Sequence, residues 1–305
     1  GHAARRLMDA GWTVRLLARR PPAHPLWAGR RYQAVPGDLA DSAALADLVA
    51  GVDAVVHLGG AVRARDRRGF RTANEAGARA VALAARAAGV ARTILVSSIA
   101  AREPGLSDYA ASKRAGEQAV AAVGGDWLVL RPTAVYGPWD TASLVLFKAA
   151  GVGIVPVHRI AEARVSFVHV ADVARAIEAA LATRETGVCE LDDGREGGYR
   201  WAEVVALAGA ALGRPARTLA LPAGLFLAAG HAAGVLARIA GRAAFFSPGK
   251  AREMMHPDWR RQAPWPADWR PSIGLEQGFA ETVAWYRERG WIGARGVRHG
   301  RARAR

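Results

Sequence analysis

An apolar run, Thr93-Ile94-Leu95-Val96, leads into Ser97-Ser98-Ile99-Ala100-Ala101 and, after a short polar turn, into Tyr109-Ala110-Ala111-Ser112-Lys113. The apolar run is typical of a buried strand. Ser107 or Asp108 is a suitable N-cap, so a helix is expected to start at the second segment. Because Tyr109 and Lys113 are four residues apart, this helix places both side chains on one face.

The residue types in this segment suit the transfer of a hydride and a proton. A free phenol titrates near pH ~10, and an ammonium group beside it favours the phenolate and lowers the pKa. A serine hydroxyl at the end of the strand can hydrogen-bond a carbonyl or alcohol oxygen. We therefore expect Tyr109 to move the proton and Ser98 to orient the oxygen, while Lys113 lowers the tyrosine pKa and holds a ribose. The alternative is an ordinary amphipathic helix with a packed tyrosine and a solvated lysine.

The rest of the chain alternates between predicted strands and helices. Apolar strands are expected near residues 13, 32, 54, 93 and 127, with helical segments between them. Such a βαβ series predicts an α/β fold in which helices cover both faces of a parallel sheet. A long helix is expected from about Phe70 to Ala88.

At Ser98, Tyr109 and Lys113 the sequence resembles the short-chain dehydrogenase/reductase superfamily, and most of all its extended or atypical branch, the NAD-dependent epimerase/dehydratase-like proteins. A second segment, Arg131-Pro132-Thr133-Ala134-Val135-Tyr136-Gly137-Pro138, closely matches the signature of that branch. There the chain leaves the sheet beside the nicotinamide, and Tyr136-Gly137-Pro138 would open the substrate region. The resemblance extends from about Gly1 to Trp291.

This resemblance implies a Rossmann-like doubly wound parallel sheet with a smaller C-terminal substrate lobe. The expected NAD(P)-binding domain comprises residues 1–131, with its sheet completed by about 164–183. The interleaved substrate-binding lobe comprises residues 132–292, and residues 293–305 are expected to be a basic disordered tail. His169 and Asp172 are expected to have structural roles.

The beginning of the chain lacks one part of the family pattern. Residues 1–11 are predicted to form a helix, and in the family this helix follows a strand and a Gly-x-x-Gly-x-x-Gly turn that holds the cofactor pyrophosphate. Gly1 matches the position just after the last glycine of that turn. We therefore expect an N-terminal truncation of about a dozen residues, which removes the first strand and the phosphate loop.

Candidate cofactor-binding residues follow the predicted strands. Arg19 and Arg20 come after the second family strand, where an acidic residue suits NAD and an arginine suits the 2′-phosphate of NADP. They predict NADP as the cofactor, with NAD less favoured. Positions that the resemblance assigns to the cofactor are Asp38, Leu39, Leu58, Gly59, Gly60, Asn74, Ser97, Tyr109, Lys113, Pro132 and Thr133. No metal site is expected, since a multi-cysteine site is excluded by a single cysteine, Cys189.

Charge and composition indicate which classes of partner the chain can bind. The net charge is +15, and five of these charges are the arginines that follow Gly293. The chain shows no nucleic-acid motif, so we expect a small-molecule substrate and no nucleic-acid partner. Residues 219–241 are apolar but interrupted by Pro222, His231 and Arg238, which favours a packed helix, with a peripheral membrane contact as the alternative. A cytoplasmic location is expected because no signal-peptide pattern is visible. The oligomeric state stays open, with a homodimer through helices 70–88 and 107–122 as the family's usual arrangement.

Three functions follow from the resemblance. The first is an NADP-dependent oxidoreductase that acts on a small carbonyl or secondary alcohol. A nucleotide-sugar epimerase uses the same three residues, but only ten residues separate Ser98 from Tyr109, and the usual Val-Tyr-Gly is missing after the serine. The third is a structural or assembly protein that binds NADPH, similar to the accessory subunit of respiratory complex I. An intact Ser-Tyr-Lys set favours the enzyme.

Overall fold

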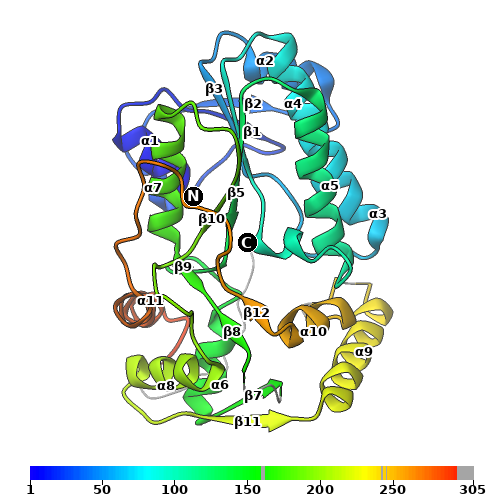
Figure 1. Cartoon of the computed structure of the whole chain (residues 1–305). Coiled ribbons are helices and arrows are strands. Elements are labelled where there is room, and N and C mark those ends of the chain that lie inside the picture. The colour runs from blue at the N-terminus through cyan, green and yellow to red at the C-terminus, as the bar shows by residue number, and fades with distance from the viewer. Residues whose placement is uncertain (159–161, 242, 245, 294–305) are drawn as a thin grey trace.

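The computed structural model describes residues 1–158, 162–241, 243–244 and 246–293. Its main sheet has four parallel strands in the order β10-β5-β4-β3, namely Gly187–Leu191, Trp127–Pro132, Arg92–Val96 and Ala54–His57. Helices cover both faces of this sheet (Figure 1). The predicted α/β fold with parallel strands is therefore confirmed, whereas the expected tail of residues 293–305 lies almost wholly outside the described residues.

The two faces of the sheet are distinguished by alternate strand residues. Ile94, Leu128 and Leu130 pack with α1 (His2–Asp9) and α7 (Val170–Ala182). Leu95 and Val129 face the opposite side, against α4 (Gly77–Ala87) and α5 (Asp108–Val123). On that side α2 (Ser42–Val49) packs on α4, and Asp41 caps it by accepting a hydrogen bond from the Ala44 amide at 3.0 Å.

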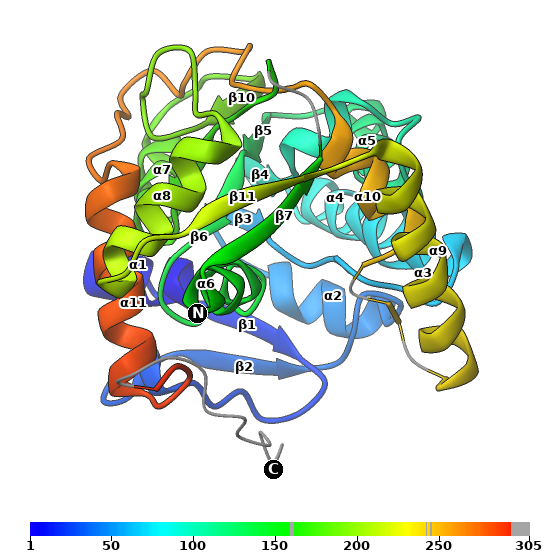
Figure 2. The ribbon, with the colours of Figure 1, turned by 90° about the horizontal axis from the view of Figure 1, so that it is seen from below.

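A second pair of strands lies apart from the main sheet. Strand β1 (Arg15–Ala18) pairs in parallel with β2 (Gln33–Pro36) but not with β3 (Figure 2). In the usual doubly wound order, one further strand lies between the positions that β1 and β3 occupy. Among the described residues each of these two strands pairs on one edge only. The separation of β1 from β3 falls at the position of that strand.

The helix expected over residues 70–88 is present, but one segment of it is π-helical. It consists of α3 (Arg67–Phe70), a π-helical segment, η2 (Arg71–Ala76), and α4. The π-helical turn carries Asn74, whose side chain contacts the backbone of Ala61, in the turn after β3, and Ser112 of α5. Turns of this kind are frequent at functional sites, because they move one side chain out of the regular helical position.

The C-terminal part contains three two-stranded parallel sheets. These pair β6 (Ala134–Tyr136) with β9 (Phe167–His169), β7 (Ile154–His158) with β11 (Arg217–Leu221), and β8 (Arg164–Val165) with β12 (Asp258–Trp259). The helices of this part are α6 (Leu144–Val152), α8 (Trp201–Leu212), α9 (Ala223–Ile239), α10 (Pro248–Met255) and α11 (Leu275–Glu288). Two short 3-10 helices lie earlier in the chain, at Pro25–Trp27 (η1) and Ile99–Arg102 (η3).

An aromatic core holds this lobe together. Phe279 of α11 lies 5.2 Å from Tyr136 and 4.9 Å from Phe147, measured between ring centres. Tyr136 is wholly buried in this core. The structural roles of His169 and Asp172 are confirmed. His169 is the N-cap of α7, and Asp172 accepts hydrogen bonds from two backbone amides of the segment before α11.

Candidate active site

The predicted catalytic residues meet where the parallel strands end. Ser97 and Ser98 follow β4, Gly59 and Gly60 come shortly after β3, and Thr133 follows β5. In open α/β sheets, ligands bind outside the carboxyl ends of the strands. The structure therefore gathers these positions at the edge where such a fold binds its cofactor.

Ser98 and Tyr109 lie beside each other. The Ser107 hydroxyl accepts a hydrogen bond from the Ala110 amide at 2.9 Å, which starts α5 and places Tyr109 in its first turn. The Ser98 side chain is near enough to the Tyr109 phenol to lower its pKa. On its other side, the tyrosine ring lies 6.1 Å from the ring of Phe70. The sequence prediction that serine and tyrosine share one site agrees with this geometry.

The expected effect of Lys113 on the tyrosine differs from what the structure shows. The pKa of Tyr109 is raised to about 12, mainly by burial. The Glu253 carboxylate adds to this rise, and the Ser98 side chain opposes it. Desolvation thus outweighs any stabilisation of the phenolate. The expectation of a lowered tyrosine pKa was wrong, because a sequence does not show how much of the phenol loses contact with water. A protonated phenol can donate its proton to an oxygen that gains negative charge.

Lys113 is directed at the end of β4. Its ammonium donates a hydrogen bond to the Val96 carbonyl at 2.9 Å. Burial lowers the pKa of Lys113 to about 8, and the Glu117 carboxylate, one turn further along α5, raises it. His57 is buried at the end of β3, and burial together with the Lys113 charge lowers its pKa to about 4. The histidine is therefore neutral at physiological pH, and its buried Nε2 has no hydrogen-bond partner among the described residues.

Asn74 connects the turn after β3 to α5. Its side-chain oxygen accepts from the Ala61 amide at 2.7 Å, and its amide nitrogen donates to the Ala61 carbonyl at 3.0 Å and to the Ser112 hydroxyl at 2.8 Å. The helices approach closely here, since a Cβ on Gly116 would lie 2.3 Å from the Asn74 carbonyl oxygen. The side chain of Asn74 thus fixes the turn after β3, which contains Gly59 and Gly60, relative to Tyr109 and Lys113.

The residues around this edge fit a nicotinamide dinucleotide. Gly59 and Gly60 are exposed and have no side chain to block a ligand, and a Cβ on Gly60 would lie only 2.6 Å from Asn74 Oδ1. The buried hydroxyls of Ser97 and Thr133 have no hydrogen-bond partner among the described residues. Two polar atoms and an open backbone are thus present where the ring and ribose of such a cofactor would lie.

Other predicted cofactor residues lie further out. Arg19 and Arg20 are exposed directly after β1. Asp38 is exposed after β2, and its carboxylate accepts from the Ala40 amide at 2.8 Å. Leu39 packs closely against Gly77, Leu58 is 51% exposed, and Pro132 is buried. Arg19, Arg20 and Asp38 follow β1 and β2, which are separate from the main sheet, and these three residues do not contact Ser98 or Tyr109.

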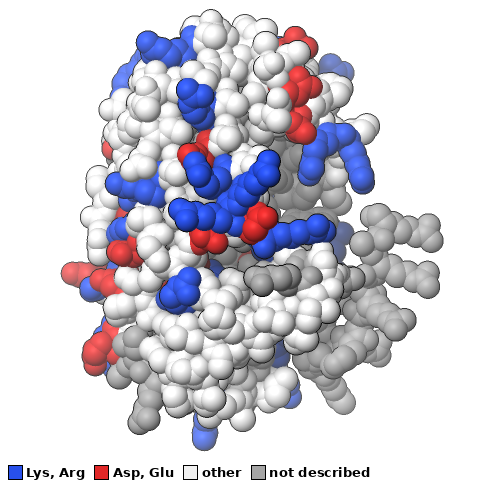
Figure 3. Space-filling model, turned by 90° about the vertical axis from the view of Figure 1, so that its right-hand side faces the viewer, with Lys and Arg blue, Asp and Glu red and all other residues white. Residues whose placement is uncertain are grey.

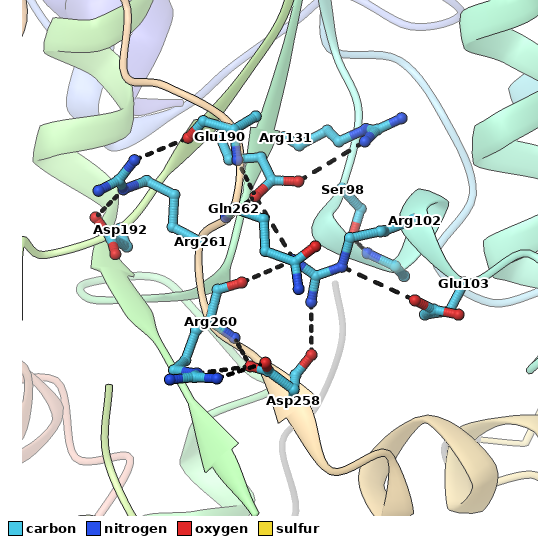
Figure 4. Close-up of polar contacts among 12 residues, drawn as sticks. Ser98, Arg102, Glu103, Arg131, Glu190, Asp192, Asp258, Arg260, Arg261 and Gln262 are labelled. Carbon is cyan, nitrogen blue, oxygen red and sulfur yellow. Dashed lines mark hydrogen bonds and ion pairs between the residues drawn. The ribbon is translucent and has the colours of Figure 1, made fainter. Parts of the chain in front are cut away.

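A network of charged residues beside Ser98 was missed in the sequence (Figure 4). Arg131, at the end of β5, donates to both oxygens of Glu117 at 2.8 and 2.6 Å and lies 3.7 Å from Glu190. Glu190 accepts from the Gln262 amide at 2.6 Å and lies 3.7 Å from Arg102. The network therefore connects α5 with the segment after β12. The sequence did offer one signal of this network, because the charged residue Arg131 directly follows the apolar run 127–130.

Arg102 joins the Ser98 loop to the C-terminal lobe. Its guanidinium donates to the carbonyls of Asp258 at 2.5 Å and Arg260 at 2.8 Å (Figure 4). A second connection was also missed: Glu253 of α10 is buried and accepts a hydrogen bond from the Ser107 hydroxyl. Residues of the C-terminal lobe thus hold both ends of the turn between Ser98 and Tyr109.

Comparison with known proteins agrees with this fold and site. The model of the NAD dependent epimerase/dehydratase family matches residues 1–190. A protein named ceramide reductase, from Caulobacter vibrioides, is 44% identical over 95% of this chain and 92% of its own length. The chain therefore belongs to the NAD dependent epimerase/dehydratase family. It is an enzyme of the NAD-dependent oxidoreductase and epimerase type.

Solved structures show the same fold. The crystal structure of gox2253 has a TM-score of 0.73 at 21% identity, with 95% of this chain and 96% of that chain covered. The UDP-glucose 4-epimerase of Thermus thermophilus, solved with NAD, has a TM-score of 0.67 at 20% identity and 94% coverage of both chains. At these identities the likeness concerns the Rossmann-type fold alone.

Proposed function

We propose that the protein is an NADPH-dependent reductase whose substrate is a ketone on a ceramide-type lipid. The observation that carries the reaction type is the placement of Ser98, at the end of β4, beside Tyr109 of α5, with Lys113 one helical turn away. The substrate class is supported by the 44% identity with a protein named ceramide reductase. An amide carbonyl resists hydride addition, so a ketone on the long-chain base is the reducible group in such a lipid.

The side chains divide the chemistry between them. When bound, the reduced nicotinamide supplies a hydride to the carbonyl carbon. Ser98 donates a hydrogen bond to the carbonyl oxygen and orients it, and Tyr109 gives that oxygen a proton as negative charge develops. Because burial raises its pKa to about 12, Tyr109 stays protonated until negative charge develops on the carbonyl oxygen. Lys113, fixed by the Val96 carbonyl, lies where it can bind a ribose hydroxyl and replace the proton.

One further assignment belongs to this proposal. The preference for NADPH rests on Arg19 and Arg20, which are exposed at the end of β1 where a 2′-phosphate would lie. The division into residues 1–131 and 132–292 stays a prediction, as do the homodimer and the structural role similar to the complex I subunit.

A direct assay tests the proposed function. The protein is incubated with NADPH and a long-chain ceramide that carries a ketone on its base, and NADPH oxidation and the alcohol product are both followed. UDP-glucose with NAD is assayed in parallel as a test of the epimerase alternative. We expect the ketone to be reduced and the sugar to be unchanged. Epimerised sugar with an unchanged ketone contradicts the proposal.

A further inference from the structure

One helix of the C-terminal lobe has an apolar face that no part of the described chain covers. Large side chains recur along one side of α9 at helical spacing, with Leu225 60%, Val235 52%, Leu236 67% and Ile239 79% exposed. Between them on the same face lie Ala228 and Ala232, which are also exposed. We call these six residues the α9 face. Exposed apolar patches of this kind mark interaction sites.

The opposite side of α9 is firmly attached to the protein. Phe226 is buried, and its ring lies 5.2 Å from that of Phe246. Gly230 is buried where a Cβ would lie 3.2 Å from the Ser247 carbonyl oxygen and 3.2 Å from the Cβ of Ala251. The helix is therefore held by its packed side, and the exposure of the α9 face is a property of the folded lobe.

The stretch of sequence that contains α9 is basic. The sequence from Val204 to Arg252 contains six lysines or arginines and no aspartate or glutamate. Lys250 and Arg252 of α10 are exposed next to α9, and Arg67 and Arg68 are exposed on α3. Figure 3 looks at the side of the molecule where α9 lies and shows basic side chains, with acidic ones among them, above a broad surface without charged side chains. An apolar helix face with a basic border complements an anionic lipid bilayer.

This surface adjoins the candidate active site. Helix α10 packs against α9, and Arg252 donates a hydrogen bond to the Leu106 carbonyl at 2.7 Å. Glu253 holds the Ser107 hydroxyl, which begins the helix of Tyr109. One short helix therefore separates the α9 face from the turn between Ser98 and Tyr109.

We propose that the α9 face docks the protein on the surface of an anionic bilayer, so that a lipid substrate enters the site from the membrane. The role in substrate entry rests on the proposed reductase function, whereas the docking itself does not. The leucines, valine and isoleucine would lie among the upper acyl chains, and the basic border at the level of the phosphates. In the described ranges every helix is too short or too polar to cross a bilayer, so this contact lies along the membrane surface.

Vesicle flotation tests the proposal. The protein is mixed with vesicles of phosphatidylcholine containing phosphatidylglycerol, or of phosphatidylcholine alone, and the bound fraction is measured. The variant Leu236→Glu/Ile239→Glu places two charges on the α9 face. The matched control is Val152→Glu on α6, where the wild-type side chain is 75% exposed. Circular dichroism checks that each variant is folded.

We expect binding to the anionic vesicles that weakens with salt, a loss of about tenfold or more in the double variant, and little change in Val152→Glu. Equal binding by the double variant overturns the proposal, as does wild-type protein that binds neither vesicle. A dimer that dissociates in the double variant, without vesicle binding, assigns the α9 face to a second copy of the chain and also overturns it.

Turnover of the ketone substrate dispersed in detergent keeps the two proposals apart. The double variant should retain this turnover and lose only turnover of substrate presented in anionic vesicles. If no form reduces the ketone, the reductase function fails while flotation still decides the docking. If both forms reduce the vesicle-borne ketone equally, the membrane route fails while the reductase function stands.

Discussion

Replacing Arg131 with methionine should destabilise the protein far more than the loss of one surface charge. The guanidinium donates to both oxygens of Glu117 and lies 3.7 Å from Glu190. The two carboxylates are only 5% and 1% exposed. Methionine fills a similar volume but leaves Glu117 with weaker partners, the Lys113 ammonium and the half-exposed guanidinium of Arg114 at 3.6 Å. Glu190 retains the Gln262 amide, so the main loss falls on Glu117.

The magnitude follows from this geometry. Breaking a buried ion pair by removing one partner costs ~3–5 kcal/mol, because a charge is left without compensation. The matched control is Arg184→Met, since Arg184 is 83% exposed and lies 3.5 Å from Asp126. An exposed pair contributes ~1 kcal/mol or less. The difference between the two variants should therefore exceed ~2 kcal/mol.

Urea unfolding followed by circular dichroism measures both variants. The midpoint should fall strongly for Arg131→Met at an unchanged slope, and hardly at all for Arg184→Met. Protonation of the unpaired carboxylate should restore part of the loss, so the deficit of Arg131→Met should shrink between about pH 7 and pH 5. A loss below ~1 kcal/mol, equal to that of the control, would refute the assignment of a buried network.

Three further predictions concern the site. Arg19→Ala should weaken NADPH binding much more than NADH binding in a fluorescence titration, and equal weakening sinks the cofactor preference. Burial lowers the pKa of Lys113 from 10.5 to about 8, so the unfolded chain binds more protons between these values and stability should rise with pH across that window by up to ~3 kcal/mol. In Lys113→Met this rise, measured by urea unfolding at pH 8 and pH 10, should disappear, and its persistence counts against the buried ammonium. Arg102→Met should lower kcat by about tenfold with little change in NADPH affinity, because it frees the Ser98 loop from Asp258 and Arg260. A fall in NADPH affinity at unchanged kcat would argue against that role.

The elements around the site were accessible from local sequence patterns. The strand over 93–96, the Ser107 cap and the Tyr109–Lys113 spacing depend on neighbours within a few residues, and the structure reproduces all three. The parallel α/β sheet followed from the alternation of predicted strands and helices.

What the sequence did not predict depends on contacts between distant segments. Arg131 meets Glu117 and Glu190, and Arg102 meets Asp258, which is 156 residues further along the chain. The raised pKa of Tyr109 follows from burial, which depends on how the C-terminal lobe packs over α5. The π-helical turn at Asn74 likewise reflects packing against α5, and the local residues 70–88 resemble an ordinary helix.

The central claim is that Tyr109 supplies the proton in a carbonyl reduction, and Tyr109→Phe tests it most directly. The measurement pairs NADPH oxidation with the ketone substrate and NADPH binding by fluorescence titration on the same protein. We predict that turnover falls by about 10²–10⁴ while NADPH affinity changes less than about threefold, because the substitution removes one hydroxyl and keeps the ring against Phe70. Turnover that survives in Tyr109→Phe would contradict the account.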